Sequence, residues 1–121
     1  MSPRPLLVVD DDADLREAIS DVLRDAGYEV VVASNGRNAI ELLGRSDPLP
    51  GLVLLDMMMP VLDGAGFLAE VRGHPVFAAI PVVVFSASAN PSLQALGARG
   101  WVRKPVDLDG LLDVVRQHAL P

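Results

Sequence analysis

Residues 52–60 read Leu-Val-Leu-Leu-Asp-Met-Met-Met-Pro, an apolar run that ends in one carboxylate and is closed by a proline. A short run of this kind, bounded by Gly51 and Pro60, is typical of a β-strand buried on both faces of a parallel sheet. Burying a carboxylate at the end of such a strand is costly unless a cation lies beside it. An acidic cluster follows an earlier apolar run and a lysine follows a later one, so Asp56 is predicted to belong to a charged site.

Composition limits the classes of protein that this chain can be. Half of its 121 residues are hydrophobic, which is enough for one domain with a sizeable core over residues 1–121. The formal net charge of -6 argues against binding to nucleic acid or to anionic membranes. The chain has no cysteine, no apolar run of membrane-spanning length and no signal-peptide pattern. We expect a soluble, cytoplasmic protein.

Five apolar runs alternate with five amphipathic segments. Besides the central run, strands are predicted at residues 5–9, 28–33, 81–85 and 101–103. Helices are predicted at residues 13–26, 37–44 and 63–73, in a short segment after residue 90, and at residues 106–120. This alternation predicts an α/β fold with a doubly wound parallel sheet of five strands and helices on both faces.

Polar side chains gather where the predicted strands end. The triplet 10–12 (Asp-Asp-Asp), Asp56, Ser86 and Lys104 each follow or close an apolar run. Because function in such sheets lies at the carboxyl ends of the strands, we expect these side chains on one rim. Two or three carboxylates without His or Cys suit a hard divalent cation, Mg²⁺ or Mn²⁺.

The same residue types suit the transfer of a phosphoryl group. A carboxylate can act as the nucleophile and form an acyl phosphate. A metal ion, the Lys104 ammonium, the Ser86 hydroxyl and backbone N–H groups can share the charge on the phosphoryl oxygens. The sequence has no glycine-rich phosphate loop, which argues against nucleotide binding.

Four segments together resemble a known family. They are residues 8–12 (VVDDD), 54–60 (LLDMMMP) with Asp63-Gly64, 85–87 (FSA) and 97–105 (GARGWVRKP). In this order and spacing they closely resemble the receiver domain of two-component response regulators, over essentially the whole chain. The resemblance implies a flavodoxin-like (βα)5 fold with strand order 2-1-3-4-5.

The resemblance also implies roles at the rim. Asp56 would be the phosphoacceptor, taking its phosphoryl group from the phosphohistidine of a histidine kinase or phosphotransfer protein. Asp11 and Asp56 would bind Mg²⁺ directly, with the backbone carbonyl of Met58 as a third ligand and Asp10 acting through a metal-bound water. Lys104 would pair with Asp56 and then with the phosphoryl oxygens.

A switch is implied beside this site. Ser86 would move toward the phosphoryl group, and Trp101 stands where the family usually has a reorienting Tyr or Phe. The segment from Ser86 to Gly97 is shorter than usual, so we expect a shortened or irregular fourth helix. That helix, with the fifth strand and the fifth helix, forms the usual output and homodimer face. The Lys104–Pro105 peptide bond would be cis, as in the family.

The implied function is regulatory rather than enzymatic, because the domain promotes only its own phosphorylation and dephosphorylation. It would signal to a downstream protein or to an output domain, whether it stands alone or belongs to a longer protein. Two alternatives stay open: a receiver-fold scaffold that is never phosphorylated, and a Mg²⁺-dependent phosphohydrolase with Asp56 as its nucleophile. Such hydrolases commonly carry a second acid where this chain has Met58. Met58 and Ser88 would flank the hydrolytic water, and Met58 offers that water no polar partner, so we expect a long-lived acyl phosphate.

Several other polar residues receive ordinary interpretations. Asp12 is predicted to cap the first helix rather than bind metal. His74 and His118 lie outside the predicted rim and are expected at the surface or at helix ends. Arg99 and Arg103 are expected to be solvated.

Overall fold

A parallel sheet of five strands forms the centre of the computed structural model, which describes residues 4–59, 61–87 and 97–120. The strands are β1 (Leu6–Val9), β2 (Val30–Ala33), β3 (Leu52–Asp56), β4 (Val82–Ser86) and β5 (Gly100–Arg103). They pair in the order β2-β1-β3-β4-β5, every neighbouring pair parallel. The predicted doubly wound sheet and its strand order are therefore confirmed.

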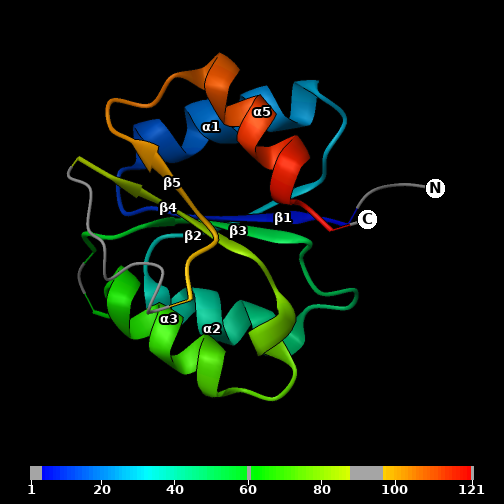
Figure 1. Ribbon diagram of the computed structural model, residues 1–121, viewed down its shortest axis with the longest axis vertical. Coiled ribbons are helices and arrows are strands. Elements are labelled where there is room, and N and C mark those ends of the chain that lie inside the picture. The colour runs from blue at the N-terminus through cyan, green and yellow to red at the C-terminus, as the bar shows by residue number, and fades with distance from the viewer. Residues whose placement is uncertain (1–3, 60, 88–96, 121) are drawn as a thin grey trace.

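Helices cover both faces of the sheet (Figure 1). One face carries α1 (Ala13–Asp25) and α5 (Leu108–His118), and the other carries α2 (Gly36–Arg45) and α3 (Gly64–Gly73). A short 3₁₀-helix, η1 (Phe77–Ala79), follows α3 and was not predicted from the sequence. The predicted short fourth helix falls on residues 88–96, which lie outside the described residues. No helix in the described parts of the chain has the length and apolar character needed to cross a membrane.

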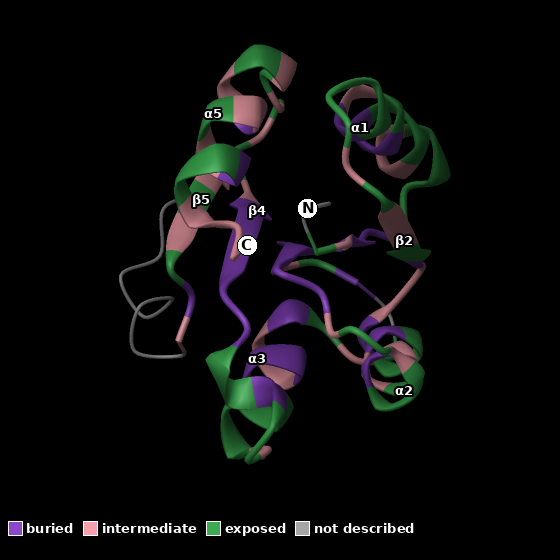
Figure 2. Cartoon of the chain, turned by 90° about the vertical axis from the view of Figure 1, so that its right-hand side faces the viewer, coloured by how far each residue is buried: buried purple, intermediate pink, exposed green. Residues whose placement is uncertain are grey.

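Successive residues of the inner strands belong alternately to two separate apolar cores. Figure 2 shows the buried strands between the two layers of helices. The core under α2 and α3 takes Leu7, Val9, Val53, Leu55, Val82 and Val84 from the strands. The core under α1 and α5 takes Leu6, Val8, Leu52, Leu54, Val83 and Phe85. Because helices bury both faces, these strands are continuously apolar rather than alternating. This is why the sequence pattern identified them.

Side-chain caps define where the helices begin. The four α-helices that the structure describes follow residues whose side chains accept backbone N–H groups of the first turn, namely Asp12, Asn35, Asp63 and Asp107. The prediction that Asp12 is a helix cap is confirmed. The last helix begins at Leu108 and not at Val106 as predicted, because the Asp107 side chain accepts the N–H of Asp109 and ends the preceding loop.

Four of the strands differ from their predicted bounds by one or two residues, and the fifth strand begins at Gly100 rather than at residue 101. The first strand begins at Leu6 rather than at residue 5, and the second begins at Val30 rather than at Tyr28, because Leu6 and Val30 are the first pair of the shared ladder. The fourth strand is shifted by one residue to Val82–Ser86. Pro81 has no N–H to donate to a neighbouring strand, so it stands before the strand. The shift brings Ser86 into the sheet.

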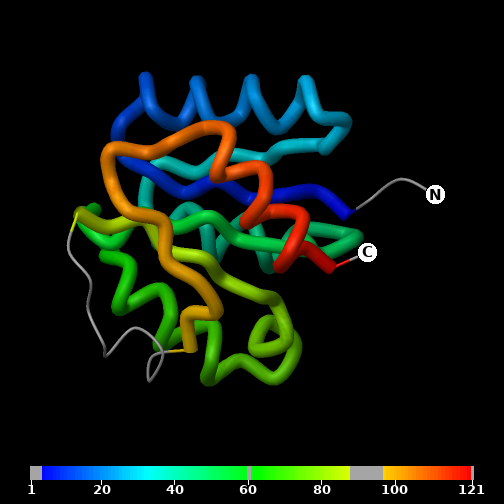
Figure 3. Tube along the Cα trace, turned by 45° about the horizontal axis from the view of Figure 1, so that its top comes forward, coloured from blue at the N-terminus to red at the C-terminus, as the bar shows by residue number. Residues whose placement is uncertain are grey.

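The two ends of the parallel strands differ in structure. At the edge where the strands begin, the Gly51 N–H donates to the Pro5 carbonyl and the Gly51 carbonyl accepts from the Leu120 N–H, which ties both ends of the described chain together. Figure 3 shows these ends on one side of the molecule and the loops that follow β1, β3 and β5 on the other. Asp56 and Ser86 are the last residues of β3 and β4, and Asp10, Asp11 and Lys104 follow β1 and β5, so these predicted site residues lie at or just beyond the carboxyl ends of the strands.

A close backbone contact supports the loop that follows β3. The Gly36 N–H, at the start of α2, donates to the Leu62 carbonyl over 3.1 Å. A Cβ atom on Gly36 would collide with that carbonyl oxygen, and it would lie 3.0 Å from the Leu62 Cβ. Gly36 therefore allows α2 to pack directly on the loop between Asp56 and α3.

We predict opposite effects for two glycine substitutions in α2. Gly36→Ala should lower the free energy of unfolding by about 1–3 kcal/mol, because the new methyl group displaces the Leu62 backbone. Gly44→Ala is the control, since nothing lies within 4 Å of its Cβ position. It should raise the free energy of unfolding by up to about 1 kcal/mol through helix propensity. Urea unfolding measures both, and a Gly36→Ala variant as stable as the parent would contradict the account of this contact.

Candidate functional site

Three carboxylates meet at the carboxyl edge of the sheet. Asp10 and Asp11 follow β1, and Asp56 ends β3, the strand that pairs with β1 up to the Val9–Leu55 partners. One carboxylate oxygen from each residue lies within 4.8 Å of the others. Asp10 and Asp56 are buried and Asp11 is exposed, so the cluster has one side open to solvent.

Lys104 supplies the positive charge next to this cluster. It follows β5, and its ammonium nitrogen lies 3.1 Å from Oδ1 of Asp56 and 3.9 Å from Oδ2 of Asp10. The peptide bond between Lys104 and Pro105 is cis. The sheet thus brings together residues of three strand ends that are distant in sequence.

Asp10 is the most constrained of the carboxylates. Its side chain is fully buried, its Oδ1 accepts the Asp12 N–H over 2.9 Å, and its Oδ2 has no hydrogen-bond partner in the described structure. Burial is the main reason that the pKa of the Asp10 carboxyl is raised from 3.8 to about 6. The negative charge of Asp56 also raises this pKa, whereas the hydrogen bond from the Asp12 N–H and the positive charge of Lys104 lower it. A buried oxygen without a partner, next to two more carboxylates, is the donor set that a hard divalent cation such as Mg²⁺ requires.

Met58 contacts Asp56 through its backbone. Its backbone N–H donates to Oδ1 of Asp56 over 3.2 Å, and its side chain is 81% exposed. The Met58 side chain is therefore largely in solvent. The expected role of the Met58 carbonyl as a metal ligand stays a prediction. Ser88, the other residue expected near the hydrolytic water, lies outside the described residues.

The side chain of Trp101 is hydrogen-bonded to the backbone of Ser86. The Ser86 carbonyl accepts two hydrogen bonds, one from the Lys104 N–H over 3.0 Å and one from the indole Nε1–H of Trp101 over 3.2 Å. The Trp101 side chain is partly solvated, with 40% of the residue exposed. A displacement of the Ser86 carbonyl would therefore change its hydrogen bonds to the Trp101 indole and to the backbone N–H of Lys104.

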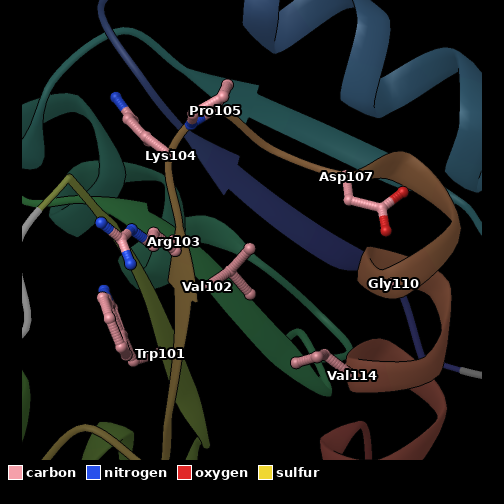
Figure 4. A pocket seen from close by; sticks show the side chains of 8 residues that line it. All are labelled: Trp101, Val102, Arg103, Lys104, Pro105, Asp107, Gly110 and Val114. Carbon is pink, nitrogen blue, oxygen red and sulfur yellow. The ribbon is translucent and has the colours of Figure 1, made fainter.

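A hollow of about 390 Å³ lies beside β5 and the start of α5, and Lys104 is one of the residues that line it (Figure 4). Figure 4 shows Val102 of β5 pointing toward Val114 of α5, with Trp101 and Arg103 on the opposite side of the strand. The hollow borders the strand and helix expected to take part in output. The one acidic residue among those that line the hollow is Asp107.

Four other polar residues, two histidines and two arginines, were expected at helix ends or at the surface. His74 follows α3, where its Nδ1 accepts N–H groups of Val76 and Phe77. His118 is the last residue of α5. Arg99 and Arg103 are exposed. None of these four side chains belongs to the carboxylate cluster.

Arg16 is a site neighbour that sequence reasoning missed. Its Nη1 donates to the backbone carbonyl of Asp10 over 2.7 Å. No sequence pattern indicates this contact, because Arg16 lies among other charged residues on the polar side of a helix. Only the packing of α1 against the end of β1 brings the two together.

The fold and the carboxylate–lysine edge together define a class of protein, the receiver-type signalling domain. Residues 6–116 match the family described as the response regulator receiver domain. The chain therefore belongs to the receiver domain family of two-component response regulators.

Relatives in this family support the assignment. The chain is similar to the regulatory protein AtoC of Escherichia coli (36% identity over 117 residues, covering 95% of this chain and 25% of that protein). It is also similar to the response regulator Rre1 of Synechocystis (36% identity, 94% of this chain and 51% of that protein). An uncharacterized 14.6 kDa protein of Leptolyngbya boryana is 35% identical and is covered over 89% of its length. The chain thus spans a quarter to a half of some relatives and most of another.

Solved structures agree with the fold. The chemotaxis protein CheY4 of Vibrio cholerae superimposes with a TM-score of 0.88 at 30% identity, covering 96% of this chain and 98% of that one. A response regulator receiver protein from Pseudomonas putida gives a TM-score of 0.86 at 31% identity, covering 97% and 99%. The similarity therefore extends over almost the full length of both chains.

We predict that Asp10→Asn stabilises the metal-free protein at neutral pH. The folded-state pKa of Asp10 lies above its ordinary value, so the ionised form is less favourable in the folded chain than in the unfolded one. Removing the charge should raise the free energy of unfolding by about 1–3 kcal/mol. The measurement is urea unfolding in the presence of a chelator.

Asp11→Asn is the matched control, because it removes the same charge from an exposed position. Its effect on the metal-free protein should be much smaller. If Asp10→Asn were less stable than the parent in chelator, the prediction would be wrong. The ionised Asp10 carboxylate would then stabilise the folded protein through its hydrogen bonds and ion pairs.

Proposed function

We propose that this receiver domain is a phosphorylation-controlled switch of a two-component phosphorelay. Asp56 accepts the phosphoryl group from the phosphohistidine of a histidine kinase or phosphotransfer protein. The observation that carries this proposal is the meeting of the Asp10, Asp11 and Asp56 carboxylates within 4.8 Å, with the Lys104 ammonium 3.1 Å from Asp56. A nucleophilic carboxylate, a site for a divalent cation and a fixed cation are the groups that phosphoryl transfer needs.

In the proposed reaction a carboxylate oxygen of Asp56 attacks the phosphorus of the donor. The new P–O bond forms as the P–N bond to the histidine breaks, and the imidazole leaves and takes up a proton. Lys104 stays beside the acceptor and shares the negative charge of the phosphoryl oxygens. The Met58 N–H, which now donates to Asp56, is placed to donate to the transferred group as well.

Asp11 and Asp56 would hold a Mg²⁺ ion directly, with the Met58 carbonyl as a third protein ligand and Asp10 acting through a water. When bound, the ion supplies positive charge for the phosphoryl oxygens. Mn²⁺ has the same preference for oxygen ligands and would also serve. The unpartnered Oδ2 of Asp10 supports this assignment, since a polar contact there would relieve a buried orphan oxygen.

The added phosphoryl charge would drive the switch. The Ser86 hydroxyl moves toward the phosphoryl oxygens in this proposal, and the Ser86 carbonyl moves with it. Because that carbonyl accepts from the Trp101 indole, the displacement reaches the exposed side of β5. The switch would thus act on β5 and α5, next to the hollow shown in Figure 4.

The proposal includes the setting of the domain. Residues 1–121 would act as one cytoplasmic receiver domain that signals to a downstream protein or to an output domain. Homodimers through the fourth helix, β5 and α5 would be one route of output. The domain would have no substrate other than its own phosphoryl donor, and no nucleic acid or membrane would bind to it.

We predict that a small phosphodonor such as acetyl phosphate adds one phosphoryl group to the protein when Mg²⁺ is present. Intact-mass spectrometry detects the product. The addition should disappear in chelator, because the metal shares the charge of the transferred group. It should also disappear in Asp56→Asn, which keeps the shape of the side chain but is not a nucleophilic carboxylate.

Each result has a distinct meaning. Mass added to Asp56→Asn would place the acceptor elsewhere and overturn the proposed role of Asp56. No added mass from the small donor or from a phosphorylated histidine kinase would favour a receiver-fold scaffold. Continuous release of phosphate from an unrelated phosphoester would mark a phosphohydrolase instead.

We predict that phosphorylation changes the fluorescence of Trp101, the only tryptophan in the chain. The indole N–H is bonded to Ser86, so a displaced Ser86 alters the surroundings of the ring. Ser86→Ala should still gain mass but show a smaller fluorescence change. A full fluorescence change in Ser86→Ala would show that the signal reaches Trp101 by another route.

A further inference from the structure

The guanidinium group of Arg16 reaches from α1 back to the end of β1. Its Nη1 lies 2.7 Å from the carbonyl oxygen of Asp10, a short hydrogen bond from a charged donor. The Arg16 residue is half-buried at this point. The contact therefore combines a strong donor with partial exclusion of water.

This bond completes the hydrogen bonding of the Asp10 backbone. The Asp10 N–H donates to the Ala33 carbonyl over 3.2 Å, and its Oδ1 accepts from the Asp12 N–H. The ladder between β1 and its neighbours ends at Val9, so the Asp10 carbonyl takes its partner from outside the sheet. With Arg16 in place, Oδ2 is the one polar atom of Asp10 that the described structure leaves without a hydrogen bond.

The orientation of this carbonyl matters for the metal site. The Asp10 carbonyl and the Asp11 nitrogen belong to one rigid peptide plane. Holding the carbonyl oxygen fixes the rotation of that plane, and with it the direction in which the Asp11 side chain leaves the backbone. Asp10 and Asp11 are two of the three carboxylates that meet within 4.8 Å. A donor that holds the plane therefore also sets the spacing of these two carboxylates.

Arg16 is itself held firmly within α1. Its N–H donates to the Asp12 carbonyl over 2.9 Å, and its carbonyl accepts the Ser20 hydroxyl over 2.7 Å, with Ser20 buried. Asp12 in turn donates its N–H to Asp10. Asp10, Asp12 and Arg16 thus form a closed ring of hydrogen bonds between the strand end and the helix.

We propose that Arg16 is a positioning residue for the divalent cation site, which holds the Asp10–Asp11 peptide in the orientation that binds Mg²⁺. This inference rests on the proposed function, because it needs that site to bind Mg²⁺. It assigns Arg16 no contact with the ion or with the phosphoryl group. Its effect is transmitted through the carbonyl of Asp10.

A positioning role and simple charge repulsion predict opposite effects of removing Arg16 on the affinity for Mg²⁺. Arg16 is a positive charge near a cation site, so by Coulomb repulsion alone its removal would strengthen Mg²⁺ binding. If Arg16 holds the peptide plane, its removal weakens binding. Arg24, in the last turn of α1, is exposed and has no side-chain partner among the described residues. Replacing it removes the same charge from the same helix without touching the site.

The experiment is calorimetric titration of the folded protein with Mg²⁺ at neutral pH, with folding of each variant checked by circular dichroism. Arg16→Met keeps most of the apolar stem and should weaken Mg²⁺ binding about tenfold, as the loss of other groups that orient metal ligands does. Arg24→Met should change it by less than about twofold, because an exposed, distant charge is screened. Arg16→Lys, which keeps the charge and a less directional donor, should fall between the parent and Arg16→Met.

Phosphorylation by a small donor at increasing Mg²⁺ separates positioning from general damage. In Arg16→Met the rate should be restored at saturating Mg²⁺, because only the affinity for the ion is lowered. A rate that stays low at saturation would overturn the inference.

The outcomes are decisive in each case. Equal or tighter Mg²⁺ binding by Arg16→Met overturns the inference and leaves the proposed function intact. No Mg²⁺ binding by the parent protein overturns both. If Arg16→Met does not fold, Arg16→Lys decides, with Arg24→Lys as its control. Weaker binding at unchanged charge then supports positioning, and binding equal to that of the parent overturns it.

Discussion

Two carboxylates, Asp10 and Asp56, are buried side by side at the carboxyl edge of the sheet, and one ammonium group, that of Lys104, lies near both. Negative charge therefore exceeds positive charge in a place that water barely reaches, and exposed Asp11 adds to the excess. Such an arrangement costs folding free energy when no cation is bound. In the proposed function this cost becomes a source of affinity for a divalent cation, because binding would relieve it.

The rest of the fold makes this cost tolerable. Apolar cores on both faces of the sheet stabilise the strands that carry the acids. At the edge itself, specific backbone contacts hold the loops: Arg16 and Asp12 hold Asp10, and the Gly36 N–H holds the loop after Asp56. The charged residues are thus fixed by their own helices and loops, while the sheet sets only their approximate distance.

The carbonyl of Ser86 links this edge to the outer strand. It accepts from the backbone of Lys104, whose side chain pairs with Asp56, and from the indole of Trp101. One oxygen atom therefore connects the acid site to a partly exposed aromatic ring. In the proposed switch, phosphorylation changes the partners of Lys104 and Ser86 together, so β5 receives the signal through two contacts.

The amino-acid sequence is sufficient to predict that there are five strands, that the sheet is doubly wound, and which polar residues stand at the strand ends. The apolar runs of the inner strands are typical of strands buried between two layers of helices, and polar residues follow or close them. Tertiary structure alone decided what depends on contacts distant in sequence. The full burial of Asp10, the closer approach of Lys104 to Asp56 than to Asp10, and the bond from Arg16 are of this kind. Periodicity records which face of an element is buried, but it carries no information about which polar atoms meet when elements pack.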